Sequence, residues 1–268
     1  MPNYQPVSRE RHAEQRWLRP VGYAHAQQEA VVPLVVAELP KAMMSLPIAF
    51  IEQAGAYTPV AVLSLLPGKD LFVAESGSWA GDYIPAAFRS YPFRMAATAD
   101  GKGVLCIDED SSLITDDPAG QPFFNPDGTI AQAMLDILNF LNQIEQSRTR
   151  TAIACAVLQK HQLICPWLIN LKTDTGEQAI NGLFQINEAA LNQLPVDALL
   201  EVRNAGALHI AYCQLLSMQH LVLLGKMIEA HGKAATQAQS ALQQLAPNGE
   251  LDIEFLNKGG TFNFSGMF

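Results

Sequence analysis

The chain has 268 residues, of which 49% are hydrophobic and 16% are charged, and its formal net charge is −9. Ordinary soluble domains contain about 25% charged residues, so this chain is poor in charge and has enough apolar material for a large core. The composition excludes a disordered chain, a collagen-like repeat and a disulfide scaffold, and the acidic balance argues against a nucleic-acid partner.

The N-terminus and the cysteines favour a reducing, cytoplasmic location. The first 20 residues are polar and lack the apolar stretch that a secretory signal peptide needs. The cysteines stand far apart without a CxxC pair, which argues against a disulfide framework and a zinc site. We therefore expect free thiols, no metal and no cofactor. The four cysteines are Cys106, Cys155, Cys165 and Cys213.

Composition along the chain suggests one main domain with two flanking segments. Residues 1–30 are polar and form the predicted N-terminal arm, and residues 247–268 form a C-terminal tail. Between them, 31–246 is expected to fold as a single domain. An acidic, proline-rich stretch at 111–128 is a candidate sub-boundary inside it.

The first half of the main domain has the pattern of short strands. Apolar runs bounded by proline and glycine predict strands, and they occur at 31–39, 46–53, 58–68, 70–75 and 104–108. The sequence Pro-Gly-Lys-Asp at 67–70 predicts a hairpin turn between two of these runs. Residues 83–90 have a proline in the first turn and predict a short helix.

The second half is mainly helical. Thr129 is a candidate N-cap for a helix of about 18 residues, because apolar residues recur after it at helical spacing. A second helix is expected over 150–161. The C-terminal part predicts a long helix at 196–231, broken near Gly206, and an amphipathic helix at 234–246.

A second hairpin is expected between these helices. Two apolar runs at 163–171 and 179–186 flank the turn-forming sequence Thr-Asp-Thr-Gly, and Asn187 can cap a short helix after them. Strands that precede helix pairs predict an α+β, or mixed α/β, fold with antiparallel sheet elements packed against C-terminal helices.

Residues 205–224 carry no charge and are long enough to cross a bilayer. Polar side chains interrupt this stretch, and each would need a partner inside lipid. We therefore expect a core helix and no transmembrane segment. The apolar face around 205–228 favours a homodimer. The interrupting side chains are His209, Gln214, Ser217, Gln219 and His220.

The sequence contains no recognisable catalytic motif. His209, His220 and His231 recur every 11 residues, which on a helix places them on nearly one face, about 16 Å apart along the axis. One metal ion cannot be bound across that distance. The histidines are therefore a seam facing a cleft or a partner, or ordinary core residues with a hydrogen-bond partner.

Charged and aromatic residues gather at 72–94. Arginine offers a planar fork for a carboxylate, and tryptophan and tyrosine offer rigid amphipathic faces, so this cluster could bind a peptide, a sugar or an aromatic acid. Alternatively, its rings are core anchors and Arg89 neutralises a nearby carboxylate. The candidate residues are Glu75, Trp79, Asp82, Tyr83, Arg89, Tyr91 and Arg94.

The same region resembles the SapC family of bacterial proteins. The resemblance rests on GSWAGDYIPAAFRSYPF at 77–93, and it extends in order and spacing over residues 10–225 through His12, Arg16 and the Ala37-Glu38 pair to GQPFFNPDG, LICPWLIN and INGLFQINEAALNQLP. The sequence departs from the family pattern at Asp70, where the pattern has asparagine before Leu-Phe.

The resemblance implies an accessory or binding protein linked to a surface layer or to an outer-membrane uptake system. Its partner would be a protein or a small molecule held near the 72–94 cluster. One alternative is an enzyme, or a subunit that assists a flavin-dependent enzyme, with His209 or His220 as base opposite Glu75, Asp82 or Arg89. Another alternative is a structural surface-layer component at the cell surface.

Overall fold

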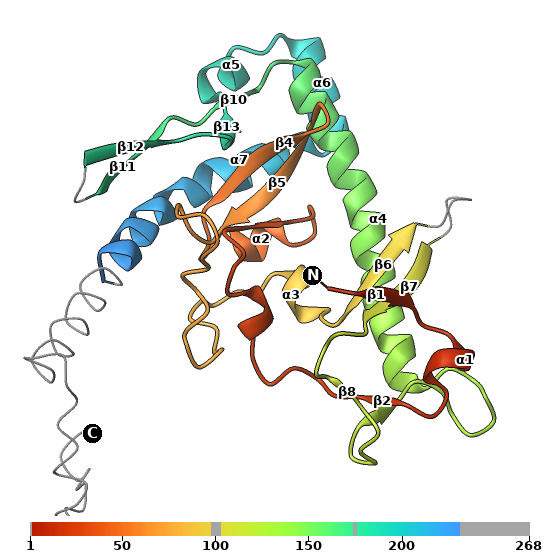
Figure 1. Ribbon diagram of the computed structural model, residues 1–268. Helices are drawn as coiled ribbons and strands as arrows, with labels where there is room; N and C mark the ends of the chain where they lie inside the picture. The colour runs from red at the N-terminus through yellow and green to blue at the C-terminus, as the bar shows by residue number, and fades with distance from the viewer. Residues whose placement is uncertain (1, 98–102, 174–175, 231–268) are drawn as a thin grey trace, which may run out of the picture. The chain divides into compact units, whose positions relative to one another are not determined.

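The computed structural model describes residues 2–97, 103–173 and 176–230 (Figure 1). The chain divides into two compact units, Met1–Leu224 and Gly225–Phe268, and the labelled helices and strands listed below belong to the first unit. Its helices are α1 (Arg9–His12), α2 (Leu39–Ala42), α3 (Ala86–Arg89), α4 (Gln132–Lys160), α5 (Glu188–Asn192), α6 (Val196–Asn204) and α7 (Ala207–Ser217).

The strands form antiparallel sheets. The largest sheet has the order β10-β13-β4-β5-β3, the next two have the orders β1-β7-β6 and β8-β2-β9, and β11 and β12 form a hairpin. Together with the helices they make an α+β fold, which confirms the predicted class. The strands are β1 (Tyr4–Pro6), β2 (Arg16–Trp17), β3 (Val31–Pro33), β4 (Ile48–Gln53), β5 (Ala56–Val62), β6 (Phe93–Ala97), β7 (Gly103–Asp108), β8 (Ile114–Thr115), β9 (Gln121–Pro122), β10 (Ile164–Pro166), β11 (Ile169–Thr173), β12 (Gly176–Ile180) and β13 (Phe184–Ile186).

The first hairpin turns at a different place from the one predicted. Strands β4 and β5 pair from Gln53 with Ala56 back to Ile48 with Ala61, so the turn is Ala54-Gly55. Both turn residues have positive φ, 51° and 78°, which is the backbone that a two-residue hairpin requires. The hairpin predicted at 67–70 is wrong, and the run at 70–75 forms no named strand. Proline and glycine mark a turn there without a second strand to pair.

Helix α4 replaces two predicted helices with one of 29 residues. The polar stretch between the two expected helices contains no glycine or proline, so nothing in it stops the helical hydrogen-bond ladder. The helix contacts β5 with one part of its length and β6 with another, and Figure 1 shows it passing both sheets. One helix therefore spans the two largest sheets.

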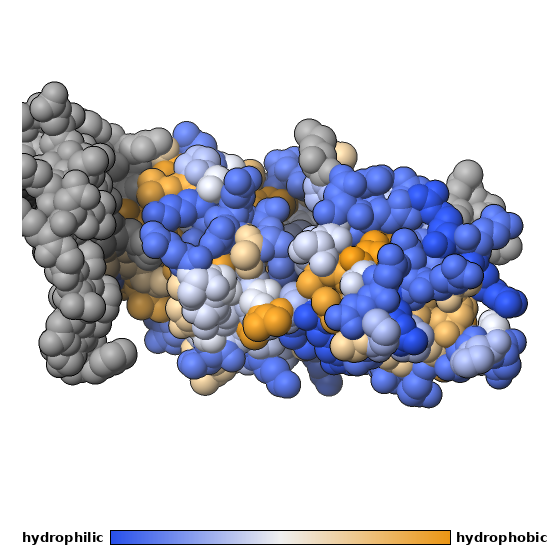
Figure 2. Space-filling view, turned by 60° about the horizontal axis from the view of Figure 1, so that its bottom comes forward, coloured by the Kyte–Doolittle hydropathy of each residue, from blue (hydrophilic) through white to orange (hydrophobic). Residues whose placement is uncertain are grey.

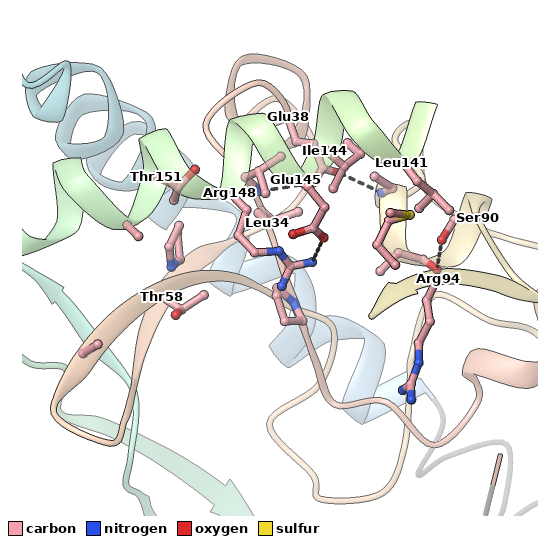
Figure 3. Close-up of a pocket in the computed structure, with 18 of the residues that line it drawn as sticks. Leu34, Glu38, Thr58, Ser90, Arg94, Leu141, Ile144, Glu145, Arg148 and Thr151 are labelled. Carbon is pink, nitrogen blue, oxygen red and sulfur yellow. Dashed lines mark hydrogen bonds and ion pairs between the residues drawn. The ribbon is translucent and has the colours of Figure 1, made fainter. Parts of the chain in front are cut away.

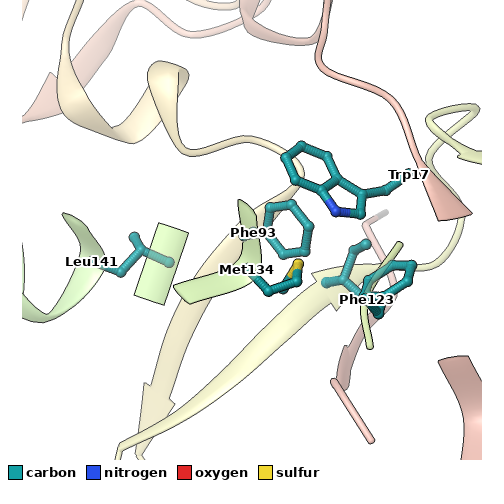
Figure 4. Close-up of a cluster of buried hydrophobic side chains, with 6 residues drawn as sticks. Trp17, Phe93, Phe123, Met134 and Leu141 are labelled. Atoms are coloured by element: carbon teal, nitrogen blue, oxygen red, sulfur yellow. The ribbon is translucent and has the colours of Figure 1, made fainter. Parts of the chain in front are cut away.

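An aromatic core lies between α4 and the β1-β7-β6 sheet (Figure 4). Trp17 and Phe93 meet edge to face at 4.9 Å, and Phe93 meets Phe123 at 6.3 Å. Met134 and Leu141 of α4 close this cluster. The aromatic ring of Trp17, at 1% exposure, fixes the N-terminal segment to the rest of the unit.

The first 30 residues contribute strands to these sheets. Strand β1 pairs with β7, and β2 lies between β8 and β9. The polar composition that predicts an arm therefore coexists with backbone pairing, because antiparallel sheets commonly have one face exposed to water.

The later elements follow the sequence closely. Strands β11 and β12 form the hairpin expected around 173–176, and the Asn187 side chain accepts from the Ala190 N–H at the start of α5. Gly206, with φ of 71°, separates α6 from α7. The helix expected at 234–246 lies outside the described residues.

Polar side chains of α7 join two strands that barely pair with each other. Strands β4 and β13 share one residue pair. Gln214, which is fully buried, accepts from the Ile186 N–H at 2.9 Å and donates to the Ile48 C=O at 3.2 Å. Ser217 accepts from the Ile48 N–H at 2.9 Å. Two of the polar residues in the uncharged stretch thus complete a sheet.

One described helix, Ala207–Ala230, is long and apolar enough to span a membrane by length and composition, and 39% of its most apolar window is buried. Core helices meet the same two criteria, so this is weak support for a membrane span.

Large apolar side chains are exposed along α6 and the helix after it, including Val196, Tyr212, Leu216 and Val222. In Figure 2, hydrophilic residues dominate one face and hydrophobic residues form separate patches. The homodimer stays a prediction.

Replacing Gln214 with leucine is expected to lower the free energy of unfolding by about 2 kcal/mol. The substitution leaves the Ile186 N–H and the Ile48 C=O buried without their partner. Urea unfolding measures the change. Gln219→Leu, at an exposed position of the same segment, is the control and should change stability by less than about 0.5 kcal/mol. Equal effects of the two substitutions would contradict this role for Gln214.

Candidate functional site

The structure divides the 72–94 cluster between a buried aromatic group, a buried hydrogen-bond network and two cavities. Trp79 belongs to the aromatic group: its ring lies 5.5 Å from Phe72, 5.8 Å from Phe88 and 6.1 Å from Tyr23. The backbone of Trp79 also forms an isolated bridge with Val73. Trp79 therefore packs mainly against these three aromatic rings.

Glu75 and Asp82 are exposed, and neither forms an ion pair with Arg89 among the described residues. Arg89 instead donates to the Ile84 C=O at 3.0 Å and lies 5.1 Å over the Phe140 ring. Its remaining contact is with the Tyr83 hydroxyl, at 3.4 Å. The guanidinium of Arg89 thus contacts Tyr83 and α4 and no carboxylate.

Glu38 is the centre of a buried network that sequence reasoning did not single out as a site residue. The side chain is 4% exposed. Its Oε1 accepts from the Tyr83 O–H at 2.8 Å and from the Ala86 N–H at 2.6 Å, and Oε2 accepts from the Val35 N–H at 3.1 Å. Burial, together with the nearby carboxylate, raises the pKa of Tyr83 well above its usual range. The only sequence signal for Glu38 was its place in the family pattern.

The turn that carries Glu38 is fixed to α4 by two buried hydroxyls. The Val36 N–H donates to Thr151 Oγ1 at 2.8 Å, and the Ala37 N–H donates to Ser147 Oγ at 3.1 Å. Both hydroxyl residues are about 95% buried, with exposures of 4% and 5%. Because Glu38 binds the same turn to α3 through Ala86, the turn connects α3 with α4.

A cavity of about 640 Å³ opens beside this network (Figure 3). It runs along α4, from Leu141 to Gln159, and its other walls come from β3 and the turn after it, from β5, from α3 and from β6. Figure 3 shows the α4 side chains Ile144, Glu145 and Arg148 over the space between β5 and β6. We call this space the α4 groove.

The charges of the α4 groove are few. Glu145 and Arg148 of α4 pair at 3.2 Å. Arg94 of β6 is exposed, and its guanidinium lies 3.6 Å over the ring of Tyr4. Among the described residues Arg94 has no carboxylate partner. Arg94 thus differs from Arg148, the other cation of the groove, which is exposed but already paired.

A second cavity, of about 160 Å³, is bordered by the end of α3. Arg89 and Tyr91 line it together with Trp17, Arg19 and Tyr23. The Tyr91 ring stacks on the imidazole of an exposed histidine, His25, at 4.0 Å, and the Tyr91 hydroxyl donates to Asp108 Oδ2 at 3.2 Å. The sequence cluster therefore contributes Arg94 to the large cavity, and Arg89 and Tyr91 to the small one.

The two described histidines of the predicted seam lie elsewhere. His209 is exposed on α7, with its Nε2 3.9 Å from Cys213 Sγ, and His220 Nε2 lies 3.0 Å from the Met43 C=O. Neither lines the two cavities described above. His231 lies outside the described residues.

The cysteines are all free, and three of them are buried. Burial raises the pKa of the Cys155 thiol to about 12 and raises the pKa of the Cys106 and Cys213 thiols as well. No group of three or more histidine, cysteine or acidic side chains is placed to hold a metal ion in the part of the chain that the structure describes.

Comparison with known families identifies one match. The model of the family described as SapC matches residues 7–224, which confirms the resemblance found in the sequence. The match includes the Glu38 network and, except for Tyr4, the residues that line the two cavities. Neither the curated proteins nor the solved structures contain a match to this chain.

Proposed function

The chain belongs to the SapC family, and from this premise we propose that it is a binding protein whose ligand occupies the α4 groove. In this role it serves as an accessory protein of a surface-layer or outer-membrane uptake system. The observation that carries the proposal is the groove itself, a mostly apolar space of about 640 Å³. Its size lies within the range of about 300–1,000 Å³ that is typical of ligand sites.

The construction of the groove supports this role. Its walls belong to different elements, and the buried Glu38 network fixes the turn, α3 and α4 relative to one another. A site whose walls are fixed in this way loses little conformational entropy on binding. Arg94, which has no carboxylate partner among the described residues, supplies a polar contact that orients a ligand in a mostly apolar space.

The enzyme alternative has less support. A general base must lie within hydrogen-bond reach of the substrate proton. The two candidate bases, His209 and His220, line neither cavity. No specific observation favours a reaction, and we therefore carry only the binding function forward.

Filling the α4 groove with a large side chain is expected to abolish ligand binding without unfolding the protein. Ala152 is exposed on α4 and lines the groove, so Ala152→Trp places an indole in the space a ligand needs. The neighbouring Ile153 is 56% exposed and does not line the groove. Ile153→Trp is therefore the matched control.

The measurement is a thermal-shift screen of the purified chain with decanoate, phenylacetate, maltose and a pool of short linear peptides. At least one of these probes should raise the melting temperature of the wild-type chain and of Ile153→Trp, and that rise should disappear in Ala152→Trp. The proposal is wrong if no probe binds, or if every probe that binds is unaffected by Ala152→Trp.

A further inference from the structure

We propose that the ligand of the α4 groove is an extended peptide segment, which adds as a further strand to the free edge of β6. This inference rests on the proposed binding function and specifies its ligand. Strand addition needs an unpaired edge whose N–H and C=O groups point into an accessible space, and pockets that accept alternate side chains. The described part of the groove has both.

The register of the sheet determines which β6 groups face the groove. The Asp108 N–H donates to the Pro92 C=O, and the Val7 N–H donates to the Leu105 C=O. Residues of an antiparallel strand alternate between facing one neighbour and facing the other. Leu105 therefore faces β1, and Met95, its partner on β6, directs its N–H and C=O away from β7. Strand β6 has no other neighbour among the described strands.

The opposite wall presents a second unpaired edge. Strand β3 pairs only with Val60–Val62 of β5, so the first half of β5 has no strand on that side. The two-residue turn at Ala54-Gly55 makes Gln53 and Ala56 a hydrogen-bonded pair, and by alternation the N–H and C=O of Tyr57 point away from β4. Tyr57 lines the groove. Two strand edges thus border the same space.

The helical wall between the two edges suits the side chains of an extended segment. Ala152 and Ala156 are small and exposed there, and Ile144 adds an apolar contact. Side chains of a strand alternate between its two faces, so every second side chain of a bound segment would lie against α4. Small residues on that wall leave room for them.

The charge of the groove indicates which peptides it prefers. Arg94 lines the groove from β6, with its guanidinium over the Tyr4 ring, and has no carboxylate partner among the described residues, whereas Arg148 is already paired with Glu145. An aspartate, a glutamate or a terminal carboxylate of the peptide would give Arg94 a bidentate partner. We therefore infer an extended, mainly apolar segment with one acidic group.

A fatty acid would also fit an apolar groove with one cation. It would make no use of the strand edges, because an alkyl chain has no hydrogen-bonding groups along its length. The unpaired backbone groups of Met95 and Tyr57 favour the peptide, and the experiment below separates the two ligands.

The first test uses the peptide. A library of linear peptides about eight residues long is selected against the purified full chain, and the tightest binder is synthesised with one N-methylated amide at a time. Only every second residue of an added strand bonds to the edge. N-methylation should therefore weaken binding about tenfold at alternate positions and have little effect between them.

The second test uses the protein. Met95→Pro removes the N–H that faces the free edge and leaves the β6–β7 ladder intact, which is where an edge strand tolerates proline. Met95→Ala keeps this N–H and accounts for the lost thioether. The selected peptide should bind Met95→Pro at least about tenfold more weakly than Met95→Ala. The N-methyl scan decides the matter alone if Met95→Pro does not fold.

The outcomes separate this inference from the proposed function. If decanoate binds in an Ala152-dependent manner and no peptide does, the binding function stands and the peptide inference is wrong. Strand addition is also wrong if the affinity of the selected peptide does not depend on which amide is N-methylated. If neither probe depends on the groove, both proposals fail.

Discussion

Replacing Glu38 with alanine is expected to lower the free energy of unfolding by about 4 kcal/mol. Three donors, the Val35 N–H, the Tyr83 O–H and the Ala86 N–H, converge on this carboxylate in the protein interior. A buried donor that loses its acceptor costs about 1–3 kcal/mol. Since all three lose theirs at once, and the link between the turn and residues 83–86 is also lost, Glu38→Ala should be among the most damaging single changes in the chain.

Glu38→Gln separates the contribution of the carboxylate charge from that of the size of the side chain. The amide keeps one acceptor oxygen for Tyr83 and Ala86 and turns its NH2 group toward the Val35 N–H, so two donors face each other. We expect an intermediate loss of about 2 kcal/mol. Urea unfolding followed by circular dichroism measures both variants. Glu14→Ala, at an exposed position with no partner among the described residues, is the control, and a loss as small as in this control would show that the Glu38 network contributes little.

Replacing Asp70 with asparagine is expected to stabilise the protein at alkaline pH by up to about 4 kcal/mol. Asp70 is 3% exposed. Its Oδ1 accepts from the Phe72 N–H at 2.7 Å, whereas its Oδ2 has no hydrogen-bond partner among the described residues. Burial, which outweighs this backbone hydrogen bond, raises the pKa of the Asp70 carboxyl to about 7.

The sign of the pH dependence follows from this pKa. An unfolded aspartate has a pKa of about 3.9, so the folded state holds the Asp70 proton more tightly. The contribution of Asp70 to stability is complete below about pH 4 and is lost as the pH rises to about 7. The free energy of unfolding of the wild type should therefore fall over this pH range. In Asp70→Asn, the part of this fall that comes from Asp70 should be absent.

Urea unfolding near pH 4 and near pH 8 tests the Asp70 prediction. The two chains should be similar at the lower pH, and Asp70→Asn should be the more stable at the higher pH. Asp82→Asn is the control, because Asp82 is exposed in the same region. If the free energies of unfolding of wild type and Asp70→Asn changed in parallel with pH, the raised pKa of Asp70 would be contradicted.

Local signals in the sequence predicted the later half of the fold better than the earlier half. The N-cap at Asn187 and the break at Gly206 are single-residue effects, and both appear where expected. The first hairpin was missed because Pro67-Gly68 is the stronger turn signal, while Ala54-Gly55 becomes a turn through the pairing of β4 with β5. Sequence pattern alone does not reveal which of two turn signals has a partner strand.

The candidate site was less predictable for a similar reason. Arg94, Arg89 and Tyr91 were singled out because charged and aromatic residues are dense there, and they line two different cavities. Glu38 lies among apolar residues, and only the packing of α3 against the turn after β3 gives it three donors. Strand edges border the groove. Whether such an edge lacks a neighbouring strand depends on how strands from distant parts of the sequence are ordered in the sheets.

The continuous helix α4 determines how the groove responds to a ligand. Its 29 residues extend over about 43 Å, with no proline or glycine at which the helix would bend. One end is fixed by the aromatic core and the other lies along β5, so the two walls are held at a set spacing by a stiff rod. A ligand must then fit a space of fixed width, and substitutions that kink α4 should change which ligands bind as well as lower the stability of the protein.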